Sequence, residues 1–143
     1  MKKILITGSS GFIGMHLSKS LLEDGFIVSG IDNMNDYYDV SIKEARLELL
    51  LKHNKFSFTN IDISNFEHVK SVFENFKPEM VVNLAAQVGV RYSLKNPHAY
   101  IQSNVVGFTN IIEACRIYDI AGLIYASSSS VYGGNKSIPF SIS

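Results

Sequence analysis

The sequence has no excess charge of either sign and no long apolar run. Its 13 lysines and arginines balance 13 aspartates and glutamates, and no basic run or basic-aromatic alternation occurs. Nucleic acid and anionic membranes are therefore not expected as partners. No apolar stretch has transmembrane length, and the short apolar segment at the N-terminus lacks the cleavage pattern of a signal peptide. We therefore expect a cytoplasmic protein.

Metal-ligand spacing and cysteine pairs are also missing. The histidines are scattered along the chain, so no metal site is expected. They are His16, His53, His68 and His98. The only cysteine, Cys115, lies in an apolar helical pattern where a small buried thiol is usual, and we assign it no function.

The composition fits one domain with a substantial core. Apolar residues make up 46% and charged residues 18% of the 143 residues, which argues against disorder. No internal repeat or low-complexity linker interrupts the chain. Strand-like and helix-like segments alternate, which predicts an α/β fold with a parallel sheet.

A glycine turn between an apolar strand and a helix is the most informative motif. Residues 3–6 form the expected strand, followed by Gly8, Gly11 and Gly14. In a dinucleotide-binding fold, the first glycine permits the tight turn, the second lets the backbone approach the pyrophosphate, and the third allows close helix-strand packing. The spacing alone also fits an ordinary strand-to-helix turn. Its position between strand and helix favours the phosphate-binding interpretation.

Asp32 ends the next expected strand, residues 27–31, and lies about 20 residues beyond the glycines, where a ribose diol binds. A 2'-phosphate would be repelled by this carboxylate, and the neighbouring Asn33 offers no cation to offset the repulsion. Asp32 therefore favours NAD over NADP. The alternative, a simple turn residue, is less favoured.

The remaining pattern predicts a doubly wound sheet. Ile13, Leu17 and Leu21 mark the apolar face of the first helix, which ends at Gly25. Ser64 is the expected N-cap of a helix that runs through residue 76. Further helices are expected over 40–52 and about 98–118, and further strands over 56–60, 80–83 and 123–126. Strand order 3-2-1-4-5 would place a ligand crevice at the carboxyl ends of the first and fourth strands.

Polar or small residues follow three of these strands. Asp62 could accept a hydrogen bond from an adenine amino group, while Ile63 packs on the adenine ring. The alternative for Asp62 is a plain Asx turn. Residues 83–87 contain two alanines that would let the backbone approach a ligand. Residues 127–133 carry four serines, whose hydroxyls can donate and accept hydrogen bonds at once, as the sharing of a proton with a substrate requires. The alternative is an ordinary serine-rich loop.

Together these segments resemble the extended short-chain dehydrogenases/reductases, and within them the nucleotide-sugar epimerases. The strings at 32–39 (DNMNDYYD), 43–47 (KEARL), 89–93 (GVRYS) and 96–97 (NP) are similar to the UDP-glucuronate 4-epimerases of surface-polysaccharide synthesis. The resemblance covers nearly the whole chain. It implies a Rossmann-like NAD-binding domain over residues 1–143, a UDP-sugar substrate and a homodimer.

The resemblance also implies roles for individual residues. Ser128 would be the catalytic hydroxyl and would contact substrate, as would Arg91, whose cation suits an anionic sugar nucleotide. Arg91 is followed by Tyr92 and Ser93, which lie where the substrate of the family begins. The implied cofactor-binding residues are Gly8, Gly11, Phe12, Ile13, Gly14, Asp32, Asn33, Asn35, Asp62, Ile63, Leu84, Ala85, Ala86, Gln87, Ser103 and Ser127.

In the reaction implied by the resemblance, bound NAD oxidises the sugar C4 hydroxyl to a ketone. The ketone intermediate then rotates, and the hydride returns to the opposite face of the sugar. The tyrosine and lysine that serve this reaction in the family lie some two dozen residues beyond the serine, so the chain is expected to stop short of them. Tyr132 and Lys136 have the right spacing, but Gly133 and Gly134 make a helix between them improbable. We expect the last strands and the substrate domain to be missing too, leaving exposed edges and an inactive fragment.

Two other functions stay open. The chain could be the first part of a sugar-nucleotide dehydratase or another 4-epimerase, because these enzymes share this half. It could also be a non-catalytic NAD-binding or interaction module. The helix around 104–117 could contribute to a dimer or cover the sheet, and the sequence does not distinguish these alternatives.

Overall fold

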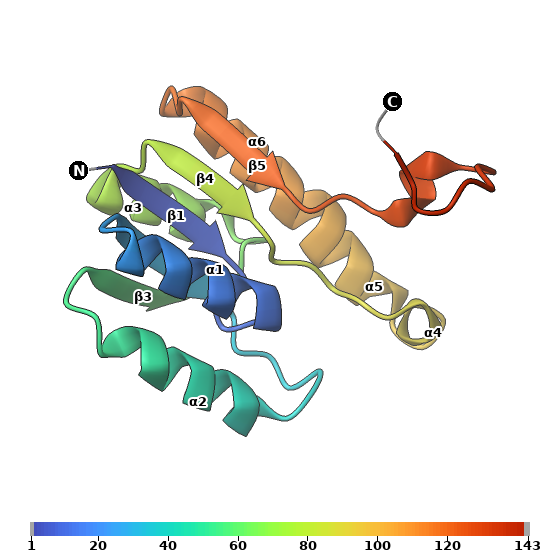
Figure 1. The fold of residues 1–143 in the computed structure, drawn as a ribbon, viewed down its shortest axis with the longest axis horizontal. Helices are drawn as coiled ribbons and strands as arrows, with labels where there is room; N and C mark the ends of the chain where they lie inside the picture. Colours follow the sequence, from blue (N-terminus) through green and yellow to red (C-terminus); the bar gives the residue numbers. More distant parts are fainter. Residues whose placement is uncertain (1, 142–143) are drawn as a thin grey trace.

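The computed structural model describes residues 2–141, which form one parallel sheet between two layers of helices (Figure 1). The sheet has five strands in the order β3-β2-β1-β4-β5, which confirms the predicted Rossmann-like α/β fold. Its central strands, β1 and β4, pair in parallel. Strands are added to one side of β1 as far as β3 and to its other side from β4 on, so the strand order reverses between β1 and β4. The strands are β1 (Lys3–Thr7), β2 (Ile27–Asp32), β3 (Phe56–Asn60), β4 (Met80–Asn83) and β5 (Gly122–Tyr125).

Helices connect the strands and cover both faces of the sheet. Figure 1 shows α1 and α2 on one face, with α3 and α6 on the other. The helical elements are α1 (Phe12–Glu23), α2 (Val40–Leu51), α3 (Phe66–Phe76), α4 (Val90–Ser93), α5 (Pro97–Tyr100), the π-helix η1 (Ile101–Gly107), α6 (Phe108–Ile117) and the 3-10 helix η2 (Ser129–Tyr132).

The alternation of side chains along β1 divides the core into two clusters. Ile4 and Ile6 pack with residues of α1 and α2 on one face. Leu5 points to the other face and packs with residues of α3 and α6. Because successive side chains of a strand point to opposite faces, this apolar run is buried on both sides. The inward face of α6, with Ile111 and Ala114, covers the sheet.

The buried face of α1 matches the predicted one in part, because Leu17 and Leu21 pack against the core but Ile13 does not. Met15, Ser18 and Leu22 face the core, whereas the side chain of Ile13 is 63% exposed. Ile13 lies in the first turn of the helix, above the glycine turn rather than above the sheet. Helical periodicity therefore gave the right element but started the buried face at the wrong residue.

The N-cap of α3 also differs from the prediction. Asn65, not Ser64, caps the helix, because its Oδ1 accepts a hydrogen bond from His68 N at 3.2 Å. The backbone N–H of Ser64 instead donates to Asp62 Oδ1 at 2.8 Å. This Asx turn uses the position before the cap and moves the start of the helix by one residue.

The long helix predicted around 98–118 contains a π-helical segment. It begins as α5 with Pro97 in its first turn, continues through η1 and ends as α6. Such insertions widen the helix locally and often occur at functional sites. Here Ser103 and Asn104 lie within the widened segment.

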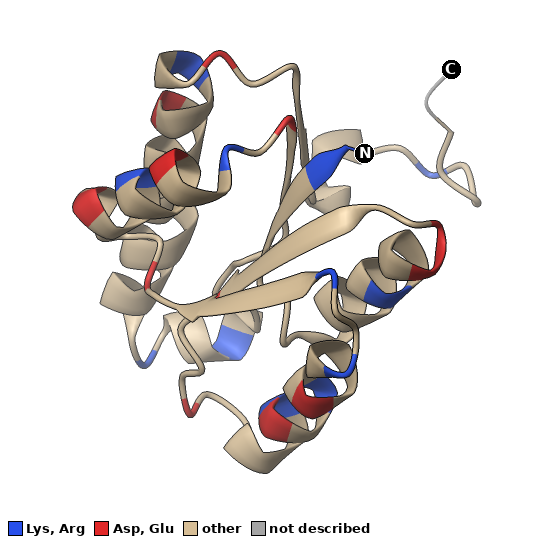
Figure 2. Ribbon diagram, turned by 90° about the vertical axis from the view of Figure 1, so that its left-hand side faces the viewer, with Lys and Arg blue, Asp and Glu red and all other residues tan. Residues whose placement is uncertain are grey.

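Charged residues of both signs are interspersed on the helices and loops, while the strands of the sheet are mostly uncharged (Figure 2). Lys3 and Asp32, at the ends of their strands, are exceptions. In the part of the chain that the structure describes, no helix is both long and apolar enough to cross a membrane.

Candidate functional site

A cavity of about 620 Å³ lies at the carboxyl ends of β1, β2 and β4. Its volume is in the range of ligand pockets, about 300–1,000 Å³. Every residue predicted to bind the cofactor lines this cavity. These residues are Gly8, Gly11, Phe12, Ile13, Gly14, Asp32, Asn33, Asn35, Asp62, Ile63, Leu84, Ala85, Ala86, Gln87, Ser103 and Ser127. The two predicted substrate residues, Arg91 and Ser128, are not in this lining.

The glycine turn brings three strand ends together where side chains would not fit. Gly8 adopts a φ of 70°, and its N–H donates to Ile31 O at 2.8 Å. A Cβ on Gly8 would lie 2.8 Å from Ala85 N, and a Cβ on Gly14 would lie 2.1 Å from Gly8 O. Both positions therefore require glycine, one for conformation and close approach, the other for helix packing.

The N-terminus of α1 is available to an anion. Gly11 is its N-cap, and among residues 2–141 no side chain caps this end. The first amides of a helix have no partner within it, and the helix dipole adds positive potential there. Because these amides open into the cavity beside Gly8, the turn fits a pyrophosphate group.

Thr7 fixes the segment that follows β4. This side chain is fully buried, and its Oγ1 donates to Asn83 Oδ1 at 2.7 Å. The same oxygen accepts hydrogen bonds from Leu84 N at 3.1 Å and from Ala85 N at 3.0 Å. The hydroxyl thus uses its donor and two acceptor positions to hold Leu84 and Ala85 at the cavity wall.

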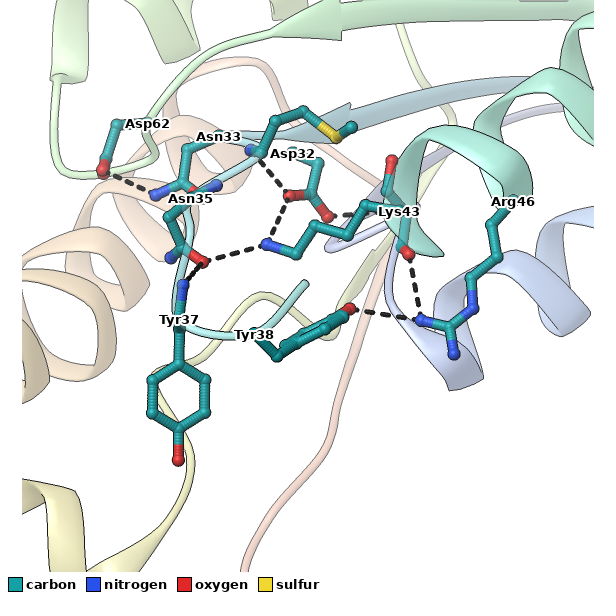
Figure 3. Close-up of polar contacts among 10 residues, drawn as sticks. Asp32, Asn33, Asn35, Tyr37, Tyr38, Lys43, Arg46 and Asp62 are labelled. Carbon is teal, nitrogen blue, oxygen red and sulfur yellow. Dashed lines mark hydrogen bonds and ion pairs between the residues drawn. The ribbon is translucent and has the colours of Figure 1, made fainter. Parts of the chain in front are cut away.

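The carboxylate of Asp32 is buried and held by backbone amides (Figure 3). Its Oδ2 accepts from Ser10 N at 3.2 Å, and its Oδ1 accepts from Met34 N at 3.0 Å. The first contact joins β2 to the glycine turn. Asp32 is therefore positioned to offer its remaining lone pairs to a ligand in the cavity, as expected for a carboxylate that binds ribose hydroxyls.

Lys43 and Arg46, two cations of α2 to which no function was assigned from the sequence, also line this cavity. Lys43 Nζ lies 3.7 Å from Asp32 Oδ1 and donates to Asn35 Oδ1 at 2.9 Å. Arg46 Nη1 donates to Ser10 O at 3.5 Å. Asp32 therefore has a cation beside it in space, Lys43, which the argument from its sequence neighbour Asn33 did not consider.

A signal for this pair was present in the sequence. The two residues are three positions apart in the expected helix, so they share one face. Their guanidinium and ammonium groups also contact aromatic rings, since Arg46 lies 5.7 Å from the Phe12 ring centroid and Lys43 lies 5.0 Å from that of Tyr38. Only the path of the loop between β2 and α2 determines that this face turns toward Asp32.

Asp62 forms the Asx turn that was one of the two interpretations considered for it, and it also lines the cavity. Its Oδ1 forms the Asx turn with Ser64, and its Oδ2 accepts from Asn33 Nδ2 at 3.0 Å (Figure 3). Partial burial acts to raise the pKa of Asp62, but the hydrogen bonds from Asn33 and Ser64 outweigh it and hold that pKa below its usual value. The side chain lines the cavity as a carboxylate, while Ile63 is buried beneath it against the core.

The π-helix η1 contacts the two segments that follow β3 and β4. Ser103 lines the cavity, and Asn104 hydrogen-bonds to the backbone of Gln87. Gly107 permits close contact, because a Cβ there would lie 2.5 Å from Ile63 Cγ1. The widened helix thus fixes the segments that follow β3 and β4.

Three tyrosine rings lie in a row that begins at Tyr37, a residue of the cavity lining. Tyr37, from the loop after β2, lies with its ring centroid 4.9 Å from that of Tyr92 in α4. Tyr92 in turn lies 6.3 Å from the ring of Tyr100 in α5. Figure 3 shows the Tyr37 ring pointing away from the Asp32 cluster. Of these three rings, only Tyr92 was expected near the site, where the substrate of the family begins.

The serine segment after β5 places only part of its hydroxyls at the cavity. Ser127 lines it, whereas Ser128 is exposed and accepts from Ser130 N at 3.2 Å as the N-cap of η2. Arg91 is likewise exposed, on α4. The 3-10 helix ends at Tyr132, and Gly133 has a φ of 59°, so no helix joins Tyr132 to Lys136.

Comparison with known sequences gives a consistent family. Residues 5–143 match the family described as GDP-mannose 4,6 dehydratase. The chain is 57% identical over 141 residues to protein CapI of Staphylococcus aureus, covering 99% of this chain and 42% of that one. It is 45% identical to the UDP-glucuronate 4-epimerase of Thermodesulfobacterium geofontis, covering 95% of this chain and 42% of the relative. The chain thus spans less than half the length of these curated relatives.

Solved structures agree with the fold and the family. The UDP-glucuronic acid 4-epimerase of Bacillus cereus, in complex with UDP-glucuronic acid and NAD, superposes with a TM-score of 0.85 at 33% identity, covering 94% of this chain and 43% of that one. The UDP-Glc/GlcNAc 4-epimerase of Campylobacter jejuni superposes with a TM-score of 0.84 at 31% identity, covering 96% and 40%.

Proposed function

Because this chain belongs to the family of NAD-dependent epimerases and dehydratases among the extended short-chain dehydrogenases/reductases, we propose that residues 1–143 are the NAD-binding domain of a UDP-glucuronate 4-epimerase. The observation that carries the proposal is the single cavity lined by the glycine turn, Asp32 and the loops after β3 and β4. Similarity to relatives named as UDP-glucuronate 4-epimerases supports this substrate.

The residues of this chain would divide the binding work along the cavity. The amides of α1 and the bare backbone of the glycine turn would receive the pyrophosphate, and Asp32 would accept from the ribose hydroxyls. Leu84 and Ala85, fixed by Thr7, would lie along the nicotinamide side. NAD, when bound, supplies a hydride acceptor and then a hydride donor for the sugar C4 position.

Ser127, in the lining of the cavity, and the exposed Ser128 follow β5 and would present hydroxyls to the sugar. Arg91 would contribute a cation for the anionic sugar nucleotide. A second copy of the chain is part of the same proposal, since the resemblance implies a homodimer.

Cofactor binding is tested first with the purified chain of residues 1–143. Calorimetric titration with NAD and NADP should show preferential NAD binding, and Asp32→Ala should lose most of it. Asp36→Ala is a matched control, because Asp36 is exposed four residues further along the same loop. Failure of the folded chain to bind either dinucleotide would contradict its assignment as an NAD-binding domain.

Catalysis is tested with the intact gene product and UDP-glucuronate. Proton NMR should show conversion to UDP-galacturonate without net change of NAD, and Ser128→Ala should slow the conversion strongly. Unchanged UDP-glucuronate together with epimerisation of another UDP-sugar would overturn the proposed substrate.

A dehydratase is the second candidate, because the matching family description names a dehydratase. The same NMR experiment distinguishes it, since dehydration gives a 4-keto-6-deoxy sugar nucleotide whereas epimerisation gives an isomer. A domain that binds NAD but converts no sugar nucleotide in any context would point to the third reading, a non-catalytic NAD-binding module.

A further inference from the structure

We propose that the ring of Tyr37 transmits the effect of cofactor binding from the loop after β2 to the segment 88–96, which contains Arg91. Tyr37 is then a positioning residue: a dinucleotide that fixes the loop also fixes Arg91 for an anionic sugar nucleotide. The inference rests on the proposed function, because it joins the proposed cofactor site to a proposed substrate residue.

The segment 88–96 has little packing of its own. No residue of α4 is buried, and Val90 and Leu94 are 84% and 87% exposed. Gly89, the N-cap of α4, has a φ of 93°. A segment with few buried apolar contacts opens locally with a small free energy. The position of Arg91 therefore depends on the few side chains that hold this segment in place.

Aromatic side chains make these contacts. The ring centroid of Tyr37 lies 4.9 Å from that of Tyr92, at an interplanar angle of 55°. The hydroxyl of Tyr100 is shared between Val88 O, at 2.8 Å, and Gly89 O. Gly89 also permits the approach of Tyr37, because a Cβ there would overlap the Tyr37 hydroxyl oxygen. Tyr37 thus fits directly against the backbone on which the segment turns.

The loop that carries Tyr37 is tied to the cavity by hydrogen bonds from its backbone to its own side chains (Figure 3). Asn35 N donates to Asn33 Oδ1 at 3.2 Å, and Tyr37 N donates to Asn35 Oδ1 at 3.4 Å. Asn33 and Asn35 both line the cavity. A ligand that binds their side chains therefore removes freedom from the loop as far as Tyr37. Because coupling between two ligands is reciprocal, a sugar nucleotide held by Arg91 would tighten dinucleotide binding by the same factor.

The test is hydrogen exchange of the segment 88–96, followed by mass spectrometry in the chain of residues 1–143 with and without saturating NAD. The amides of Tyr92, Lys95 and Asn96 report on the segment, because each donates to a backbone oxygen within it. We expect NAD to slow their exchange about two- to tenfold, the factor that an aromatic pair supplies.

Three variants separate the ring from other effects. Tyr37→Leu removes the contact with Tyr92, so it should lose the NAD effect on the segment 88–96 and keep the NAD effect on the glycine turn. Tyr37→Phe keeps the ring and should behave as wild type does. Tyr132→Leu is the matched control, because the Tyr132 ring stacks on that of Phe140, 4.6 Å away, and is not in the cavity lining. It should also behave as wild type does.

A second comparison decides the question if Tyr37→Leu does not fold, as judged by circular dichroism. Gly89→Ala places a methyl group against the Tyr37 hydroxyl and should lose the NAD effect on the segment 88–96. Adding Tyr37→Phe removes the overlapping oxygen and leaves ring carbon Cζ at 3.4 Å, an ordinary contact. The strain of the alanine backbone is the same in both proteins. The double variant should therefore recover the NAD effect, and equal exchange in the two proteins would overturn the inference.

The two proposals fail in different ways. If NAD changes exchange neither at the glycine turn nor at 88–96 in folded wild type, the proposed function is contradicted. If NAD protects the glycine turn but not 88–96 in wild type, or protects 88–96 equally in folded Tyr37→Leu, only the role of Tyr37 is contradicted.

Discussion

Asn104 and Gln87 form a reciprocal pair of hydrogen bonds that joins the π-helix η1 to the loop after β4. Asn104 Oδ1 accepts from Gln87 N at 2.8 Å, and Asn104 Nδ2 donates to Gln87 O at 2.9 Å. A carboxamide is the side chain that satisfies both backbone groups of one residue in this way. The pair therefore fixes the path of the loop that carries Leu84, Ala85 and Ala86 along the cavity.

Asn104→Ala should weaken NAD binding without unfolding the chain. The variant loses two hydrogen bonds, each worth about 1 kcal/mol, so the loop gains freedom that binding must remove. We expect about a tenfold loss of NAD affinity by calorimetry. Gln102→Ala, two residues earlier in η1 and exposed, is the control and should bind as wild type does. Equal affinity of the Asn104 and Gln102 variants would contradict a positioning role for Asn104.

Thr7→Val should destabilise the fold although it preserves side-chain shape. The hydroxyl of Thr7 is fully buried and makes three hydrogen bonds, to Asn83, Leu84 and Ala85. In the valine variant Asn83 Oδ1 and Ala85 N would lose this partner, while Leu84 N keeps its second hydrogen bond, to Thr7 O at 3.2 Å. We therefore expect a loss of about 2–4 kcal/mol in the free energy of unfolding, measured by urea titration.

Thr109→Val is the matched control for this change. The hydroxyl of Thr109 also donates a hydrogen bond, to Val105 O at 2.7 Å, but it is exposed to water. Its loss should change the free energy of unfolding by less than about 1 kcal/mol. A similar loss in both variants would show that the buried hydrogen bonds of Thr7 stabilise the fold no more than the exposed one of Thr109.

Much of the sheet could be predicted because each strand has a local signal. β3 and β4 match their predicted bounds, β1 and β2 each extend one residue further, and β5 begins and ends one residue earlier than predicted. Cavity residues at the strand ends were accessible to the same reasoning, since in a parallel sheet the residues after each strand meet at one edge, whereas others, such as Asn35 and Ser103, came only from the family resemblance. Asp32, Asp62 and Ala85 lie together for this reason.

The missed features depend on contacts between distant segments. Lys43 reaches Asp32 only because the loop after β2 turns α2 toward the cavity. The π-helical widening coincides with two long-range constraints, the hydrogen bonds of Asn104 to Gln87 and the close contact between Gly107 and Ile63. Neither constraint has a periodic signature in the sequence, so local patterns could not reveal it.

Gly14→Ala should disrupt the turn that the cavity depends on. The added Cβ would meet Gly8 O at 2.1 Å, and this contact cannot be relieved by a side-chain rotation, because the backbone fixes both the Cβ position and the carbonyl oxygen. We expect a loss of about 1–3 kcal/mol in the free energy of unfolding, with NAD binding reduced further than the loss of folded protein explains.

Gly134→Ala serves as the control for added volume at a glycine. Nothing lies within 4 Å of the Cβ it would carry. Urea unfolding and calorimetry of this variant should match wild type within error. Wild-type behaviour of Gly14→Ala would contradict the packing of α1 on the glycine turn.

Cys115 should react slowly in the native chain. Burial raises the pKa of its thiol from 9.0 to about 11, so the thiolate fraction at pH 8 falls about a hundredfold. Reaction with 5,5'-dithiobis(2-nitrobenzoate), followed at 412 nm, should therefore be at least that much slower in buffer than in 6 M guanidinium chloride. Equal rates in the two conditions would contradict the partly buried position of the thiol.

The same shift fixes the sign of a pH effect on stability. Because the pKa is raised in the folded state, the folded chain keeps this proton between about pH 9 and 11 while the unfolded chain loses it. The contribution of the thiol to stability is thus fully present below pH 9 and declines as the pH rises toward 11. Urea unfolding of wild type and Cys115→Ala at pH 7.5 and pH 10 separates this effect from lost packing: the difference in unfolding free energy between the two proteins should narrow at the higher pH. A difference that is the same at both pH values would show that the thiol titrates alike in both states.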